Sequence, residues 1–455
     1  ATGERVVAER TPRVLVGGPG SEWPALRRWG DSSYLEERLG VLDSVYHNTA
    51  PTFVWENPDR EMGVRLGVGA RAPHTLRDAV PARDLFSGIT SCANASGSAV
   101  EYLYSTLQLP PSLAGDAPIS GMGLAEHHPV ARGVQTNLWL GGCGSTAHPH
   151  FDVSHNFHVQ VVGRKTFELW PPWARLHMYP FAHPADRQSM IGDVVDNATA
   201  FANSGGQVYL PTPVVVKLAP GEMLYIPPFW AHRVTAGQSL TASVSIWWDS
   251  PEGDWFNAAC RVGLPPGLMR SQPGSQHRIE SLVLYVHALA KALGAQDGAS
   301  ARDLVRHYLY DDRYSLIEAD LRCKDVPMNW QDVCSPGAKH AQPPSLSPPN
   351  WPGRDVANEA SSDAWAHYAQ QVIRALGPEG TTAQTDAPPG KVMASGSPSH
   401  RNTTIEHYVA VRRTLLIDYM EHVAGYAVGV ARVCAFFRVC GGLHLPEEKP
   451  AGLPT

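Results

Sequence analysis

Pro149-His150-Phe151-Asp152 is the stretch on which the expected fold depends most, together with Tyr225-Ile226-Pro227-Pro228-Phe229-Trp230-Ala231-His232. Both stretches are typical of β-strands. Residues two apart on a strand point to the same face of a sheet, so His150 and Asp152 can bind one metal ion together. A later strand can then supply His232 as a third ligand. Two histidines and one carboxylate on one face of an octahedron leave the opposite positions open, as in non-haem Fe(II) centres.

The sequence around these stretches has the pattern of a β-sheet. A His-x-Asp motif alone can arise by chance among 20 histidines. Here, however, Asn156–Val162 and Lys165–Pro172 read as strands on either side of a Gly163-Arg164 turn. The turn Ala219–Met223 precedes the second stretch, and Ser243–Trp248 alternates apolar and polar residues after it. We therefore expect a mainly β core.

In order and spacing, these segments resemble the JmjC branch of the cupin superfamily, the Fe(II)- and 2-oxoglutarate-dependent oxygenases. The pattern is most similar to small JmjC hydroxylases such as the asparaginyl hydroxylase of hypoxia-inducible factor, and it extends from about Arg13 to Asp249. The further segments that carry it are Arg13–Gly18, Trp23–Trp29, Asn137–Gly141, Tyr179-Pro180 with His183–Ser189, and Gly221–Pro227. The resemblance implies a double-stranded β-helix, the jelly-roll or cupin barrel.

The resemblance also implies a role for four of the side chains. His150, Asp152 and His232 match the iron ligands. Lys165 matches the lysine that binds the distal carboxylate of 2-oxoglutarate. The physical reason is that a dicarboxylate chelating iron at one end leaves a second anion, which needs a compact cation in a narrow barrel.

Two more positions match residues that hydrogen-bond the cosubstrate in related enzymes, Asn156 and Tyr102. The offset of Asn156 from the metal strand is fixed, whereas Tyr102 can be confused with Tyr104 in the same stretch. The cofactors implied by the resemblance are Fe(II) and 2-oxoglutarate.

One position departs from the family pattern. Several members place a threonine three residues before the first histidine, where it bonds the distal carboxylate of the cosubstrate. This chain has Ala147 at that position and Thr146 before it. Two alternatives follow: either the cosubstrate pocket is rebuilt locally, or a Ser or Thr from another strand, such as Ser243 or Ser245 of the closing strand, takes over.

The composition argues against several classes of partner. A formal net charge of −6 and a pI near 6.4 give no electrostatic footprint for nucleic acid, so no direct DNA binding is expected. No uninterrupted apolar stretch reaches the ~18 residues that a membrane span needs. The best candidate, Val423–Cys440, contains Arg432 and Arg438 and is interpreted as an amphipathic or buried helix.

The sequence favours the secretory pathway slightly over the cytoplasm or nucleus. The chain begins at Ala1, which predicts removal of a preceding segment by a signal peptidase or by cloning. Cys323 and Cys334 flank a short segment and are predicted to form a disulfide, while the odd total of seven cysteines leaves at least one unpaired. Three N-x-S/T sequons are present, at Asn94, Asn197 and Asn402.

The chain divides into three predicted regions. Residues 1–135 form an N-terminal α/β region integrated with the barrel, and residues 136–250 form the catalytic barrel. Residues 251–455 form a helical C-terminal extension with Pro/Gly-rich loops at 335–354 and 377–400.

Local patterns predict elements within these regions. A strand is expected at Arg13–Val16, a helix at Ser33–Leu39, and the end of another helix at Leu107–Pro111, because proline cannot continue it. Phe181–Pro211 is interpreted as a loop-rich insert that selects the substrate. Helices in the C-terminal extension are predicted at His277–Leu293, Ala301–Tyr310, Val356–Leu376 and Thr404–Val439, the last capped by Asn402 or Thr403.

The resemblance implies hydroxylation of a side chain in a protein or peptide substrate. A JmjC lysine demethylase or a tRNA-base hydroxylase are alternatives of the same chemistry. The absence of a Cys/His zinc cluster from the sequence argues against the demethylase, and the formal net charge of −6 argues against a tRNA substrate. A non-catalytic cupin scaffold is the alternative of another class. The C-terminal helices are expected to pack on the barrel or to form a homodimer; a separate partner-binding module is the other possibility.

Overall fold

The computed structural model describes residues 3–53, 75–77, 79–94, 100–119, 133–180, 187–190, 211–272, 275–297, 301–315, 362–377 and 398–440, with Cys323, Pro327, Trp330 and Cys334. The predicted loop 335–354, residues 378–397 of the second predicted loop, Asn197, and residues 181–186 and 191–210 of the predicted insert lie outside the described residues.

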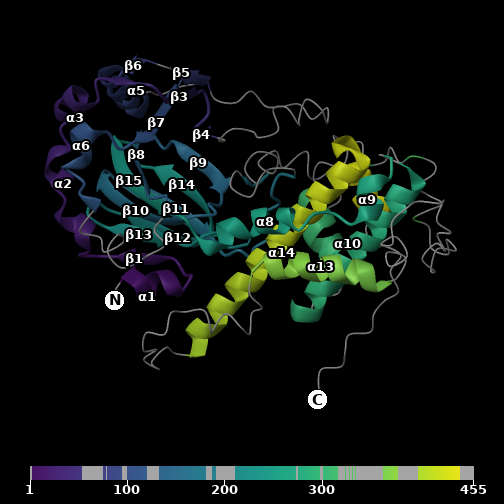
Figure 1. Ribbon diagram of the computed structural model, residues 1–455. Helices are drawn as coiled ribbons and strands as arrows, with labels where there is room; N and C mark the ends of the chain where they lie inside the picture. Colours follow the sequence, from purple (N-terminus) through teal and green to yellow (C-terminus); the bar gives the residue numbers. More distant parts are fainter. Residues whose placement is uncertain are drawn as a thin grey trace.

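The described strands form two large sheets and one small one (Figure 1). Their bounds are β1 (Arg13–Leu15), β2 (Val41–Leu42), β3 (Val45–Asn48), β4 (Thr52–Phe53), β5 (Thr75–Arg77), β6 (Val80–Pro81), β7 (Tyr102–Gln108), β8 (Gln135–Gly141), β9 (Thr146–His150), β10 (His155–Val162), β11 (Lys165–Trp170), β12 (Val214–Leu218), β13 (Met223–Ile226), β14 (Ala231–Ala236) and β15 (Thr241–Trp248). The first large sheet has the order β1-β13-β10-β15-β8-β7-β3-β5 and the second β12-β11-β14-β9-β4, while β2 pairs with β6. These largely antiparallel sheets make the predicted jelly-roll barrel, so the expected fold class is confirmed.

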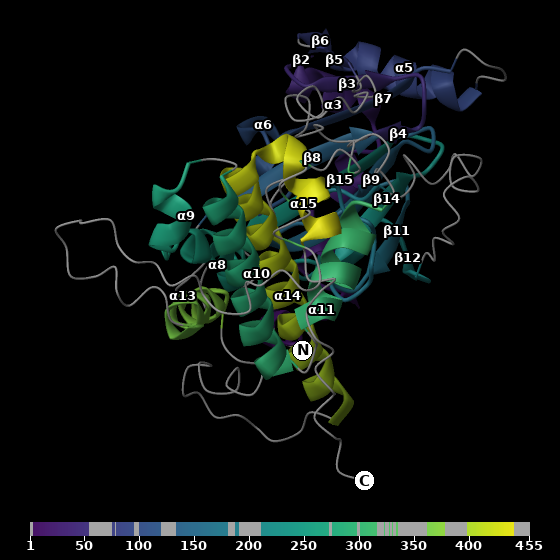
Figure 2. The ribbon, with the colours of Figure 1, turned by 90° about the vertical axis from the view of Figure 1, so that its right-hand side faces the viewer.

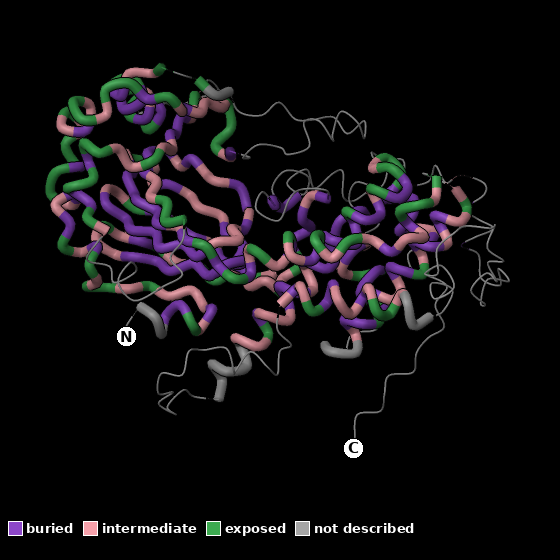
Figure 3. Tube along the Cα trace, viewed as in Figure 1, coloured by how far each residue is buried: buried purple, intermediate pink, exposed green. Residues whose placement is uncertain are grey.

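Period-two alternation gives the barrel an apolar exterior layer and a polar interior. In β10, Phe157 belongs to the hydrophobic core outside the first sheet, whereas Asn156 and His158 line the cavity inside the barrel. In β15, Val244 belongs to the same outer core and Ser245 lines the same cavity. Both faces of these strands are therefore buried, as the purple strands in Figure 3 show.

A glycine corner passes the chain from one sheet to the other. β10 and β11 are consecutive but belong to different sheets. Gly163 between them has φ +67°, and a Cβ there would lie 2.6 Å from the carbonyl oxygen of Leu240. The predicted turn is therefore confirmed, and it delivers Lys165 to the first position of β11.

Short helices of the N-terminal region cover the outer face of the first sheet. They are α1 (Gly3–Ala8), η1 (Pro19–Glu22), α2 (Ala25–Arg28), α3 (Ser32–Leu39), α5 (Ala82–Asn94) and α6 (Pro111–Ala114). The predicted helix α3 begins where the carboxylate of Asp31 accepts a hydrogen bond from the backbone of Ser33. Trp29 and Leu35, both fully buried, share a core with Phe157 of the sheet.

The helix predicted to end at Leu107–Pro111 is wrong, because Tyr102–Gln108 is strand β7. β7 pairs with β3 on one side and β8 on the other. This pairing in the tertiary structure outweighs the local pattern. Pro111 instead lies in the first turn of α6, where its missing N–H has no partner to lose.

Helices dominate the C-terminal extension. They are α8 (Pro251–Arg261), α9 (Pro266–Arg270), α10 (Gln276–Asp297), α11 (Ala301–Asp303), the π-helix η4 (Leu304–Asp311), α13 (Ser362–Ala375), α14 (Pro398–Val428), the 3-10 turn η6 (Val430–Arg432) and α15 (Val433–Val439). The helix predicted at His277–Leu293 is found with shifted ends, and the one predicted at Ala301–Tyr310 is divided into α11 and the π-helix η4. Of Val356–Leu376, the described residues are helical from Ser362 to Ala375, and residues 356–361 lie outside the described part. The last predicted helix is wrong as a single helix, because Gly429, with φ +82°, ends α14. Its cap is also wrong, since Asn402 and Thr403 lie inside α14.

The C-terminal helices pack directly against the barrel. One hydrophobic core joins Phe151 and Phe229 of the barrel to Leu282 of α10 and Leu416 of α14. Figures 1 and 2 show these helices gathered on one side of the sheets. The packing expected for the extension is therefore present, and the homodimer stays a prediction.

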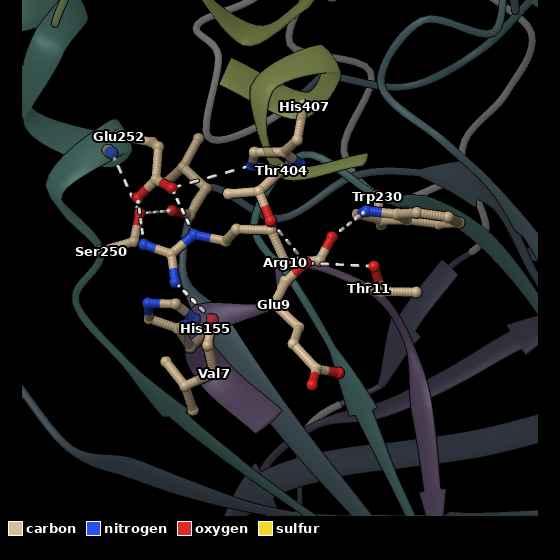
Figure 4. Close-up of polar contacts among 12 residues, drawn as sticks. Val7, Glu9, Arg10, Thr11, His155, Trp230, Ser250, Glu252, Thr404 and His407 are labelled. Carbon is tan, nitrogen blue, oxygen red and sulfur yellow. Dashed lines mark hydrogen bonds and ion pairs between the residues drawn. The ribbon is translucent and has the colours of Figure 1, made fainter. Parts of the chain in front are cut away.

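A buried ion pair fastens the N-terminal segment to these helices (Figure 4). Arg10 Nε donates to Glu252 Oε1 in α8 over 2.6 Å, and His407 Nε2 of α14 lies 3.7 Å from the same oxygen. Trp230 Nε1 donates to the carbonyl oxygen of Arg10 over 3.0 Å. Burial by itself would raise the pKa of Glu252, but the charge of Arg10 outweighs it and holds this pKa well below its usual value. Loss of one partner would leave a buried charge unpaired, at a cost of about 3–5 kcal/mol.

Among the described residues, no single helix is both long and apolar enough to cross a bilayer. Thr404–Val428 and Val430–Val439 meet the length and composition test only when taken together, and they are bent by 109° relative to each other.

Three disulfides are present, and the predicted one is not among them. Cys323 bonds Cys434 and Cys334 bonds Cys440, with Cα–Cα distances of 5.1 and 4.9 Å. Cys92 bonds Cys143. The predicted Cys323–Cys334 pair is therefore wrong. Its two cysteines each reach α15 and the residue that follows it, more than 100 residues further along the chain, because both segments pack in one core.

The pairing predicts the effect of removing one long-range bridge. Cys323→Ser should lower the free energy of unfolding by about 2–4 kcal/mol, because the bridge restricts a long loop in the unfolded chain. Denaturant unfolding of oxidised protein measures this change. Cys260→Ser is the control and should change little, since Cys260 is exposed and unbonded. Seven alkylatable thiols in the natively isolated protein would contradict the pairing.

Candidate active site

A cavity of ≈ 460 Å³ lies between the two large sheets. It holds five of the six residues expected at the site, all except Tyr102. The lining residues used below are Tyr46, Tyr104, Thr106, Trp139, Ala147, His150, Phe151, Asp152, Asn156, His158, Lys165, Gln188, His232, Ser245 and Trp247. The interior of the barrel is therefore the candidate site.

Strand pairing brings the two candidate histidines together. β9 and β14 are antiparallel neighbours, and His150 lies directly opposite His232 in their register. Their ring centroids are 4.3 Å apart. Residues that lie opposite each other in an antiparallel pair project to the same face, so both imidazoles enter the barrel.

Backbone contacts fix the tautomer of both imidazoles. Nδ1 of His150 donates to the carbonyl oxygen of His148 over 2.7 Å, and Nδ1 of His232 donates to that of Trp230 over 3.0 Å. A carbonyl only accepts, so each Nδ1 carries the hydrogen and each Nε2 keeps its lone pair. Burial and the neighbouring His150, opposed by Asp152, lower the pKa of His232 to about 4. His232 is therefore neutral near pH 7, the form that binds metals.

Asp152 completes the cluster just beyond the end of β9. Its Oδ2 lies 3.8 Å from His232 Nε2 and accepts a hydrogen bond from Trp247 Nε1 over 3.3 Å. Its backbone oxygen accepts from the N–H of Phe229 over 2.7 Å. Phe229 has φ +62°, an uncommon conformation for a bulky residue that orders the turn before β14. This backbone bond ties the two ligand-bearing segments together.

The three candidate ligands fit a divalent transition metal. One donor atom from each of His150, Asp152 and His232 lies within 4.8 Å of the others. Both imidazoles have a free Nε2 lone pair and donate from Nδ1 to a backbone carbonyl oxygen, as metal-bound histidines usually do. Two nitrogens and one carboxylate on one side leave the cavity side open, the donor set of non-haem Fe(II) centres.

Lys165 is a buried cation in the same cavity. Its Nζ donates to Ser243 Oγ over 2.7 Å and lies 6.0 Å from the centroid of the Trp139 ring. Burial lowers its pKa to about 7. Keeping the Lys165 side chain charged in the unliganded cavity costs free energy, and a bound anion would remove that cost.

Both candidate serines of the closing strand, Ser243 and Ser245, contact side chains that line the cavity. Ala147 faces the cavity without a polar group, and the hydroxyl of Thr146 donates to Gly144 O over 3.0 Å. Ser243 accepts a hydrogen bond from Lys165 over 2.7 Å. The other, Ser245, lies 3.0 Å from Nδ1 of His158. The closing strand therefore rebuilds this part of the pocket.

Several polar atoms in the pocket have no hydrogen-bond partner within the described part of the protein. They are Oδ1 of Asn156, Oγ1 of Thr106 and Nε2 of His158. Burial, and after it the charge of Lys165, holds the pKa of His158 well below its usual value. Each unsatisfied buried atom costs about 1–3 kcal/mol. The hydroxyl of Thr106 can donate to a carboxylate oxygen, so together with Lys165 it fits the dicarboxylate that the resemblance implies, whereas the amide oxygen of Asn156 can only accept a hydrogen bond.

Tyr102 is a wrong assignment, and Tyr104 lines the cavity in its place. Both side chains share one face of β7, but Tyr102 begins the strand and pairs with Asn48 beyond the cavity. Tyr104 is stacked on Tyr46 with centroids 4.8 Å apart and an interplanar angle of 10°. Sequence spacing alone cannot choose between two residues of one type on one face.

Sequence reasoning missed other lining residues. Alternation from Asn156 could have identified His158, because both lie on one face of β10. Gln188 lies in the His183–Ser189 segment that carries the resemblance, but its spacing in the chain did not indicate its bridge to His150. Three aromatic side chains, Trp139, Phe151 and Trp247, also line the cavity. Trp230 instead packs in a small separate core.

Comparisons with known proteins agree with this geometry. A family model described as a cupin-like domain matches residues 1–254. Jumonji C domain-containing protein 5 of Drosophila melanogaster is 26% identical over 237 residues, 50% of this chain and 52% of that protein. Lysine-specific demethylase JMJ30 of Arabidopsis thaliana is 34% identical over 116 residues, 25% of this chain and 26% of that protein. The tRNA wybutosine-synthesizing protein 4 of Neurospora crassa is 32% identical over 277 residues, 56% of this chain and 20% of that protein.

The matches differ in how much of this chain and of each relative they cover. This chain spans about half the length of the Drosophila relative and about a quarter or less of the other two. The family model, in contrast, covers more than half of this chain, including every described strand of the barrel. The chain therefore belongs to the cupin-like domain family, in its JmjC branch.

Proposed function

We propose that this protein is an Fe(II)- and 2-oxoglutarate-dependent dioxygenase that hydroxylates a side chain of a protein or peptide. The observation that carries the proposal is one cavity that contains both a three-ligand cluster and a buried cation. The cluster is His150, Asp152 and His232, and the cation is Lys165. Family membership supports the same chemistry.

Each ligand is prepared for its part before a metal binds. Nε2 of His150 and Nε2 of His232 would bind the ion, because their Nδ1 hydrogens are held by backbone oxygens. Asp152 would supply the negatively charged ligand, and Nε1 of Trp247 orients this carboxylate by donating to its Oδ2. When bound, Fe(II) with 2-oxoglutarate would supply the oxidising power that attacks a substrate C–H bond.

The cosubstrate would lie between the metal cluster and Lys165. The ammonium of Lys165, oriented by Ser243, would bind the distal carboxylate. The buried hydroxyl of Thr106, which lacks a partner in the described protein, would donate to one of the remaining oxygens, and Asn156 would donate to another through its amide N–H. Trp139 would exclude water along one wall.

A protein substrate is the first choice among the possible substrates. The sequence pattern resembles small hydroxylases, and a formal net charge of −6 does not favour a polyanion such as tRNA. The name of the Arabidopsis relative makes lysine demethylation the second candidate. Mass spectrometry of candidate peptides separates the two: hydroxylation retains one added oxygen, whereas demethylation releases formaldehyde. A scaffold without catalysis would produce no succinate from 2-oxoglutarate in any assay.

Removal of the carboxylate ligand should abolish turnover without unfolding the protein. Asp152→Ala is expected to reduce iron-dependent succinate formation to background, while its denaturation midpoint stays close to that of the parent protein. The side chain of Asp152 is 23% exposed, so its removal leaves little packing unfilled. Asp254→Ala in α8 is the matched control, because Asp254 is exposed outside the cavity. Parent-level turnover by Asp152→Ala would refute the metal assignment.

Removal of the buried cation should affect the cosubstrate selectively. Lys165→Met is expected to raise the KM for 2-oxoglutarate at least tenfold, since an unpaired buried charge costs more than about 2 kcal/mol. Co²⁺ binding should stay near the parent value. Lys217→Met on the neighbouring strand β12 is the control, because Lys217 is exposed. An unchanged KM in Lys165→Met would remove Lys165 from the pocket chemistry.

The lowered pKa of Lys165 predicts a pH effect on binding. The cation binds the carboxylate, and in the free protein it is lost as pH rises through about 7. The affinity of the Mn²⁺-loaded protein for 2-oxoglutarate should therefore fall with rising pH, by up to tenfold per unit above that value. Calorimetric titrations from about pH 6 to pH 9 measure this slope. Lys165→Arg, which stays charged throughout, should flatten it; a flat profile in the parent would exclude Lys165 as the titrating group.

A further inference from the structure

Arg187 begins a short segment that supports the first metal-binding strand. Gln188 bridges antiparallel to His150. The N–H of Ser189 donates to Pro149 O over 2.9 Å, and that of Phe151 donates to Arg187 O over 3.4 Å. Residues 187–189 thus extend the sheet beside the backbone that carries His150 and leads to Asp152.

The side chain of Arg187 leaves this segment toward the C-terminal helices. It is only 1% exposed, and Nη2 donates to Asp418 Oδ1 of α14 over 2.8 Å. Nη1 lies 3.7 Å from Glu421 Oε2 and donates to the carbonyl oxygen of Tyr179. Asp418 and Glu421 are three residues apart on α14, so both carboxylates occupy one face of the helix.

A second arginine balances the charges in this cluster. Arg313, just after η4, contacts Asp418 and donates from Nη1 to Glu421 Oε2 over 3.2 Å. The hydroxyl of Tyr314 donates to Glu421 Oε1 over 2.6 Å. Two positive and two negative side chains, each at most 3% exposed, thus meet between the barrel and the helices.

Such a cluster restricts the relative position of α14 and the 187–189 segment more than it increases the free energy of unfolding. Burying four charges is costly, and apolar residues of similar volume are often equally stabilising. Charge-assisted hydrogen bonds are short and directional, however, so they fix the distance between α14 and the 187–189 segment. That segment is one bridge away from a candidate metal ligand.

We propose that Arg187 is a positioning residue, through which α14 holds the strand that carries His150 in the metal-binding geometry. The inference rests on the proposed metal site. On this proposal the C-terminal helices support the metal site structurally and are not a separate partner-binding module.

The test uses the full chain and Co²⁺ as the probe, with affinity measured by titration at a temperature where all variants are folded. Arg187→Met should weaken Co²⁺ binding by about tenfold or more, the usual effect of removing a group that orients a metal ligand from outside the coordination sphere. Arg187→Lys should recover part of this loss. The double variant Arg187→Met with Asp418→Asn removes one charge of each sign, so it should regain stability but not affinity.

Asp116→Asn is the matched control for general destabilisation. Asp116 is buried and accepts hydrogen bonds from Trp29 and Tyr34, away from the cavity. It should lower stability and leave Co²⁺ affinity unchanged. If the double variant regains both stability and affinity, or if Arg187→Lys and Arg187→Met bind like the parent, the positioning role is refuted.

The outcome is separate from that of the proposed function. Parent protein that binds Co²⁺ through Asp152 but produces no succinate would refute the oxygenase and leave the role of Arg187 intact. Should Arg187→Met fail to fold, the double variant and Arg187→Lys decide the question. Parent-like affinity in both of them refutes the role, and weakened affinity at restored stability supports it.

Discussion

The antiparallel pairing of β9 with β14 is the constraint on which the rest of the site depends. It sets His150 opposite His232, and a slip of one residue would turn one imidazole out of the barrel. The backbone bond from Phe229 to Asp152 holds the third donor beside this pair. Ligand geometry is thus set by backbone hydrogen bonds, which exist before any metal binds.

The barrel around this pairing has an unusual distribution of polarity. The first sheet presents its apolar side chains outward to the N-terminal helices and its polar side chains inward. An interior with a buried ammonium and unsatisfied oxygens is costly for an unliganded fold, by about 1–3 kcal/mol for each unsatisfied atom. The ammonium of Lys165 and the unpartnered hydroxyl of Thr106 make the interior complementary to an anionic ligand. Stability and binding therefore make opposite demands on these residues, and the apolar exterior layer offsets the cost.

The C-terminal helices contact this barrel through two buried ionic clusters. Glu252 of α8 contacts both Arg10 and His407 of α14, and the carbonyl oxygen of Arg10 accepts a hydrogen bond from Trp230, two residues before His232. Asp418 and Glu421 meet Arg187, one residue before the partner of His150. Both clusters include residues of α14, so this one helix approaches both metal-bearing strands from outside. The hydrophobic core shared by Phe151 and Leu416 fills the space between the clusters.

The sequence by itself predicted the barrel, the cluster of His150, Asp152 and His232, and the presence of Lys165 in the same cavity. Those inferences depend on short-range patterns, namely the alternation of a strand, the spacing of a His-x-Asp motif and a glycine corner. Only the tertiary structure decided between Tyr102 and Tyr104, which share a face of one strand and differ only in how far along it the cavity reaches. It alone decided the disulfide partners of Cys323 and Cys334, because packing of distant segments, and not spacing in the chain, brings sulfur atoms together. It alone also revealed Arg187, since the carboxylates that neutralise this arginine lie more than 200 residues away and no local pattern records such a contact.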